Sequence, residues 1–150
     1  MVGTQVYCYV SDVAGAIQEA ARVLRKGGRL LILDSDWDMC AWNSKDPLLT
    51  RRMVAGRAAR FAHAHLPREL HCLVRAAGLT LIHVNAFSII ETRYDADSFG
   101  VSMIETTCEA ALRDEVPAAE VAAWEEDLRS CETGGEWFFC LNRFIFSATK

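Results

Sequence analysis

The chain has 150 residues, a formal net charge of −4 and a hydrophobic content of 51%. This length suits one domain with a sizeable core, and the acidic balance gives no footprint for nucleic acid or an anionic membrane. No apolar run approaches the roughly 20 residues that span a bilayer, and the N-terminus lacks the layout of a secretory signal, so we expect a soluble, cytoplasmic protein.

The first elements in the chain are a strand stub, a helix and a buried strand. Met1 to Val6 forms at most a short strand, and Ser11 or Asp12 caps the helix that follows. The buried stripe of this helix is Val13, Ile17, Ala20, Ala21 and Leu24. Gly27 and Gly28 end the helix. The apolar run Leu30 to Leu33 does not alternate with polar residues, which is typical of a strand covered on both faces.

A helix that feeds such a strand indicates a parallel α/β sheet. Ligands of open sheets bind beyond the carboxyl ends of the strands. This places Asp34, Ser35, Asp36 and Trp37 at a candidate site, at the start of an expected loop that continues to Lys45. Trp37 and Trp42 could stack on a substrate ring or fill the core. The aspartates could orient a nucleophile or cap a local turn.

The rest of the chain reads as helices and two further strands. After Asp46-Pro47 the pattern predicts helices over 48–64 and 68–77, an extended segment over 80–94, helices over 98–113 and 118–131, and a last strand over 136–149. The first of these helices carries one basic side, which is either a solvated face or a site for an anionic group; its members are Arg51, Arg52, Arg57 and Arg60.

Three stretches carry a resemblance to a known family. They are Val6-Tyr7-Cys8-Tyr9-Val10-Ser11-Asp12, Arg22-Val23-Leu24-Arg25-Lys26-Gly27-Gly28-Arg29, and Leu73-Val74-Arg75-Ala76-Ala77-Gly78-Leu79. Together they resemble the second half of a class I S-adenosylmethionine-dependent methyltransferase. The glycine-rich loop that holds the methyl donor in this family has no counterpart here.

The resemblance implies a partial Rossmann-like sheet. It corresponds to strands four to seven of the family, with the last hairpin antiparallel and helices on the faces. Residues 1–150 would then form a single partial methyltransferase domain, in which 98–131 is a helical, lid-like insertion between the last two strands. The first cofactor-binding half would be absent, either because the chain is truncated or because a partner supplies that half.

The resemblance also implies site residues. Thr4, Gln5 and Val6 would touch the methionine part of the donor. Tyr9, Asp34, Asp36, Trp37 and Asn142 would face the substrate, and Arg143 is a further rim candidate. No catalytic residue is assigned. The cofactor would be S-adenosylmethionine, without a metal, because the spacing of His63, His65, His71 and Cys72 matches no common zinc pattern.

Two classes of function remain open. The first is methyl transfer to a small-molecule acceptor by a truncated or partner-completed domain. The second is a non-catalytic half-domain that acts through self-association or docking, as a homodimer or by strand exchange, because a bare sheet edge invites pairing. The six cysteines are scattered through mostly apolar segments, so we expect them to be reduced core residues.

Overall fold

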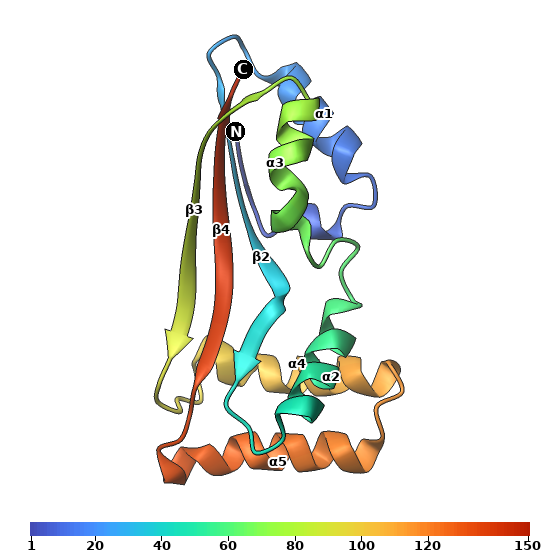
Figure 1. Cartoon of the computed structure of the whole chain (residues 1–150), viewed down its shortest axis with the longest axis vertical. Coiled ribbons are helices and arrows are strands. Elements are labelled where there is room, and N and C mark those ends of the chain that lie inside the picture. Colours follow the sequence, from blue (N-terminus) through green and yellow to red (C-terminus); the bar gives the residue numbers. More distant parts are fainter. The chain divides into compact units, whose positions relative to one another are not determined.

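The protein is a mixed α/β fold built on one four-stranded sheet, and the computed structural model describes residues 1–150. The strands are β1 (Val2–Thr4), β2 (Arg29–Trp42), β3 (Thr80–Glu91) and β4 (Phe139–Thr149). The helices are α1 (Val13–Val23), α2 (Pro47–Ala58), α3 (Leu66–Ala76), α4 (Phe99–Arg113) and α5 (Ala118–Gly134), with a 3-10 turn η1 at Tyr7–Tyr9. Figure 1 shows their arrangement along the chain.

The strand order is β1-β2-β4-β3, so β2 is an interior strand, as the apolar run Leu30 to Leu33 predicts. β1 pairs with β2 in parallel, and Thr4 stands opposite Leu33. β4 runs the other way (Figure 1): just before β2, the Gly28 carbonyl accepts a hydrogen bond from the Lys150 amide, and the Gly27 amide donates to the Lys150 carbonyl after the end of β4. β3 and β4 are neighbours in the sheet although α4 and α5 separate them in sequence. The expected α/β sheet with a helical insertion before its last strand is therefore confirmed.

The chain divides into two compact units. Unit 1 comprises Met1–Asp36, Phe61–Phe87 and Asn142–Lys150, and unit 2 comprises Trp37–Arg60 and Ser88–Leu141. Strands β2, β3 and β4 each contribute residues to both units. The single domain that we expected from the sequence stays a prediction, as does the lid-like role of 98–131.

The core of unit 1 lies between the sheet and two helices. Ile17 of α1 and Leu70 of α3 are fully buried against Ile32 of β2 and the aromatic side chain of Phe146 on β4. α1 begins where the Asp12 carboxylate accepts a 2.8 Å hydrogen bond from the Gly15 amide, which satisfies one of the free amides of the first turn. Because α1 and α3 share this one cluster, they cover the same face of the sheet.

The core of unit 2 is aromatic. The Trp42 ring lies 5.4 Å from Trp124 in an edge-to-face arrangement and 5.0 Å from Phe139. The Trp124 indole nitrogen on α5 donates a 3.0 Å hydrogen bond to the Thr50 hydroxyl on α2, which ties the two helices together. Trp42 therefore fills the core, which was one of the two roles left open by the sequence.

The loop expected from Asp36 to Lys45 is wrong, because β2 continues to Trp42. The side chains of Trp37, Cys40 and Trp42 are buried in unit 2, so the strand is stabilised by packing beyond its apolar run. α2 is also shorter than expected and ends at Ala58. The four arginines predicted to form one basic side of α2 do not all face solvent, because Arg57 is buried. Its guanidinium lies 5.0 Å above the Trp37 ring and donates a 2.6 Å hydrogen bond to the Thr106 hydroxyl.

Candidate functional site

The carboxyl end of β1 is marked by a sharp change of backbone direction. β1 ends at Thr4, and Gln5 adopts a positive φ of 53°, which is uncommon for a residue other than glycine. The Gln5 amide still donates a 2.8 Å hydrogen bond to the Leu33 carbonyl. Asp34 and the residues after it therefore extend past the end of β1, at the edge where a parallel α/β sheet binds ligands.

The Gln5 side chain lies at the centre of a polar cluster in unit 1. In the orientation in which both the oxygen and the nitrogen of the Gln5 side-chain amide have hydrogen-bond partners, the nitrogen donates to Asp34 Oδ1 at 2.9 Å. The amide oxygen accepts from Arg143 Nη2 at 2.7 Å and contacts the Ser35 hydroxyl. We call Gln5, Asp34, Ser35 and Arg143 the β1-edge cluster. It offers an anion, a cation, an amide and a hydroxyl within one small region.

Asp34 is a buried carboxyl group with no exposed surface. Its Oδ2 accepts a 3.3 Å hydrogen bond from the Cys8 amide, and its Oδ1 accepts a 3.0 Å hydrogen bond from the Ser35 amide. Burial raises the pKa of Asp34 above its ordinary value, while the hydrogen bonds from Cys8 and Ser35 and the charge of Arg143 act in the opposite direction. The net result is a carboxyl group that holds its proton more strongly in the folded chain than in the unfolded one.

This shift predicts how stability depends on pH. Between the unfolded pKa of about 3.9 and the higher folded pKa, the native state binds more protons than the unfolded state, so stability falls as pH rises. The quantity to follow is the difference in free energy of unfolding between the wild type and Asp34→Asn. We expect this difference to decrease as the pH rises from 4 through the pKa of Asp34 in the folded chain. Urea unfolding at several pH values measures this difference. A flat or rising difference would show that burial does not dominate at Asp34.

Asp36 belongs to a second polar group in unit 1. It is 1% exposed, and its carboxylate receives the Arg68 guanidinium of α3 at 2.6 Å and 3.0 Å. His65 Nδ1 lies 3.7 Å from Asp36 Oδ1. A two-pronged contact of this kind fixes the orientation of the Asp36 carboxylate. It also compensates for burying this charged side chain within β2.

The other predicted site residues are not gathered at one place. Thr4 and Val6 flank Gln5, and both are exposed, as is Tyr9, whose ring packs 5.2 Å from that of Phe61. Asn142 lies partly buried in β4. Trp37 belongs to unit 2, where it packs against Arg57 within β2, so its predicted position in a loop is wrong, and its contact with substrate stays a prediction.

Three residues of these polar groups were not assigned to a site from the sequence. They are Cys8, His65 and Arg68. Cys8 acts on Asp34 through its side chain and through its backbone amide, and the backbone contact is one that no side-chain pattern reveals. Arg68 lies 32 residues after Asp36, and nothing in the local sequence indicates that pairing. His63 contacts the Ser11 carbonyl oxygen and His71 contacts Cys72, and the structure contains no cluster of three metal-ligating side chains.

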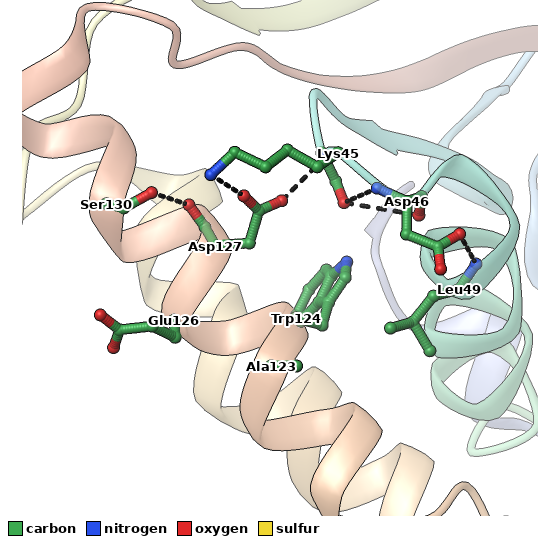
Figure 2. A pocket seen from close by; sticks show the side chains of 9 residues that line it. Lys45, Asp46, Leu49, Ala123, Trp124, Glu126, Asp127 and Ser130 are labelled. Atoms are coloured by element: carbon green, nitrogen blue, oxygen red, sulfur yellow. Dashed lines mark hydrogen bonds and ion pairs between the residues drawn. The ribbon is translucent and has the colours of Figure 1, made fainter.

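Unit 2 contains a cavity of about 610 Å³ between the start of α2 and the side of α5. Figure 2 shows the Lys45 side chain reaching Asp127, at 3.0 Å, above Trp124. The Lys45 amide also donates to Asp127, at 2.8 Å. Burial raises the pKa of Asp127, but these contacts with Lys45 outweigh it and hold the pKa below its ordinary value. The polar groups in this cavity are largely satisfied by one another, as are those of the β1-edge cluster. The cluster is the stronger candidate site because it lies at the carboxyl end of a parallel strand, where ligands of α/β sheets bind.

The fold is similar to that of known structures. Two solved structures align with 99% of this chain. One is a candidate methyltransferase from Bacillus halodurans C-125, at 17% identity and a TM-score of 0.55, and the other is the YcgJ protein from Bacillus subtilis, at 18% identity and a TM-score of 0.53. The chain has a class I methyltransferase-like fold.

The likeness extends over only part of the neighbours. The chain spans 68% of the length of the B. halodurans protein and 63% of that of YcgJ. No protein-family model and no curated protein matches the sequence. None of the helices has the length and apolar character needed to cross a bilayer.

Proposed function

We propose that the β1-edge cluster contacts S-adenosylmethionine and that the fold serves methyl transfer to a small molecule, as part of a truncated or partner-completed domain. The observation that carries this proposal is the backbone turn at Gln5, which presents the cluster past the end of a parallel strand in a methyltransferase-like sheet. This is the edge of the sheet where ligands of α/β folds bind.

The chemistry of the cluster fits the amino-acid end of that donor. An α-ammonium group suits the Asp34 carboxylate, and an α-carboxylate suits the Arg143 guanidinium and the Ser35 hydroxyl. Gln5 would hold the two charged groups apart and would supply both a donor and an acceptor. The donor, when bound, supplies an activated methyl group on a sulfonium centre. The residues of this chain would bind and orient it and exclude water.

Isothermal titration of the wild-type chain with S-adenosylhomocysteine tests the proposal. We expect measurable binding at or below about 1 mM, and we expect Gln5→Ala to weaken it about tenfold, which corresponds to about 1.4 kcal/mol. Gln18→Ala is the matched control, because Gln18 is an exposed glutamine on α1 in the same unit. Absence of binding at millimolar ligand, or equal weakening by both substitutions, would contradict the proposal.

A second candidate function is a non-catalytic half-domain that acts through docking. It is favoured by β1, which is an edge strand of only three residues with Val2 66% exposed. The unpaired edge of such a strand can receive another strand. A chain that gives no heat with S-adenosylhomocysteine but associates with itself or another polypeptide would support this function over methyl transfer.

A further inference from the structure

The cavity between the start of α2 and the side of α5, which we call the α2–α5 cavity, has the size of a ligand site. Its volume of about 610 Å³ lies within the range of about 300–1,000 Å³ that is usual for small-molecule pockets. A second cavity of about 170 Å³ shares Ser44, Lys45 and Asp127 with it. The ion pair of Lys45 and Asp127 therefore lines both spaces, and all of these residues belong to unit 2.

The charges that line the α2–α5 cavity are mostly negative. Asp46, Glu126 and Asp127 supply three carboxylates against the one ammonium group of Lys45. The positive end of the α2 dipole does not offset them, because Asp46 already caps it and accepts hydrogen bonds from two amides of the first turn. The cavity is therefore complementary to a cation and not to an anion such as a phosphate.

The Asp127 carboxylate is held in place for a positive partner. Its side chain is 14% exposed, and it accepts a 2.8 Å hydrogen bond from the Lys45 backbone amide. That contact remains when the Lys45 side chain moves. In Figure 2 the Lys45 ammonium stands beside Asp127, where the cation of a ligand would stand. The Lys45 side chain is 78% exposed, so its ammonium can return to water at little cost, because exposed ion pairs contribute little to stability.

The uncharged part of the lining favours an organic cation over a bare metal ion. It includes three apolar or aromatic residues, Leu49, Ala123 and Trp124. The Trp124 indole nitrogen is engaged by the Thr50 hydroxyl, so the ring offers the cavity apolar surface rather than a hydrogen-bond donor. Apolar surface of this kind matches a hydrocarbon body. The structure contains no cluster of three metal-ligating side chains.

We propose that the α2–α5 cavity binds a small organic cation, an ammonium group carried on an aromatic or aliphatic body. The ammonium of the ligand replaces that of Lys45 at Asp127, and the body packs beside Leu49 and Trp124. Lys45 then extends into solvent, so it acts as an internal competitor that lowers the affinity of the site. The site lies within unit 2, and this inference does not depend on donor binding at the β1-edge cluster.

Titration of the isotopically labelled full chain with 2-phenylethylamine, followed by amide chemical shifts, tests the proposal. We expect saturable changes at Lys45 and Ser130, which line the cavity, with a Kd of about 1 mM. Two probes of similar shape are the controls: 2-phenylethanol is neutral and 3-phenylpropionate is an anion. Both should bind at least about tenfold more weakly. Equal binding of the alcohol, or no saturable change with the amine up to about 20 mM, would overturn the proposal.

Variants of the ion pair test the replacement of Lys45 by the ligand. Asp127→Asn should weaken binding of 2-phenylethylamine at least about tenfold. Glu132→Gln is the matched control, because Glu132 is an exposed acid of α5 that lines neither cavity. It should bind like the wild type, and equal weakening by both substitutions would overturn the proposal.

Lys45→Ala gives the sharpest result, because it removes the competing ammonium from an exposed side chain. Binding of 2-phenylethylamine should tighten by about threefold or more. A variant that binds the amine no more tightly than the wild type would overturn the replacement of Lys45 at Asp127. Circular dichroism of each variant confirms that the fold is kept.

Discussion

Replacing Trp124 with alanine should lower the free energy of unfolding by about 3–5 kcal/mol. The Trp124 side chain is 1% exposed, packs edge-to-face on Trp42 and bonds the Thr50 hydroxyl. Its removal leaves a large cavity between α2 and α5 and removes the hydrogen bond to the Thr50 hydroxyl, which keeps its own bond to the Asp46 carbonyl. Such a loss is a large fraction of the roughly 5–15 kcal/mol that stabilises a domain. Urea unfolding followed by far-ultraviolet circular dichroism measures it.

Trp124→Phe serves as the control for this prediction. Phenylalanine keeps most of the ring packing and loses the 3.0 Å hydrogen bond to Thr50, so the expected cost is about 1–2 kcal/mol. If Trp124→Ala costs no more than Trp124→Phe, packing of the indole is not what stabilises unit 2, and the description of its core is wrong.

The second large effect is expected at Arg68. Arg68→Ala removes the guanidinium that contacts both oxygens of Asp36, whose carboxylate is almost fully buried. A buried charge that loses its partner is strongly destabilising. Because the Arg68 side chain is itself half exposed and His65 remains nearby, we expect a cost of about 2–3 kcal/mol, below the upper range for buried pairs. Chemical denaturation measures it.

Two further variants isolate the ion pair from the packing of the arginine side chain. Arg68→Lys keeps the charge but loses the two-pronged geometry, so it should cost less than Arg68→Ala. Combining Arg68→Ala with Asp36→Asn completes a double-mutant cycle. The combined cost should be clearly smaller than the two single costs added together. Additive costs would show that Asp36 and Arg68 do not stabilise each other.

The regular elements could be predicted from the sequence because their signals are local. The stripe containing Val13 and Ile17 marks α1, the glycines after it mark its end, and the apolar run Leu30 to Leu33 marks the interior strand. The two helices before the last strand were also expected within a few residues of their observed bounds. Periodicity and caps carry this information without any long-range contact.

The full extent of β2 could not be predicted for a physical reason. Two buried aspartates, Asp34 and Asp36, interrupt its apolar pattern, and buried charged residues normally argue against a strand. The free-energy cost of burying these two carboxyl groups is offset by groups that are far away in the sequence. The Cys8 amide and Gln5 contact Asp34, and the Arg68 guanidinium contacts Asp36. These pairings depend on tertiary structure, so the strand was cut short in the prediction.

The candidate site was predicted in part. Gln5, Asp34, Ser35 and Arg143 were all named from the sequence, and the structure brings the four together. Trp37 was placed there by its distance along the chain, but the strand continues through it and its ring packs in unit 2. Proximity in sequence located the polar residues of the cluster, whereas the packing of the Trp37 ring depends on tertiary contacts that the local sequence does not show.

The central claim is that the β1-edge cluster is where a methyl donor contacts this chain. Amide chemical shifts of the isotopically labelled protein, recorded during titration with S-adenosylhomocysteine, test it most directly. The account predicts that the largest changes occur at Gln5, Cys8 and Ser35. Changes confined to the Lys45–Asp127 cavity, or no changes at saturating ligand, would contradict it.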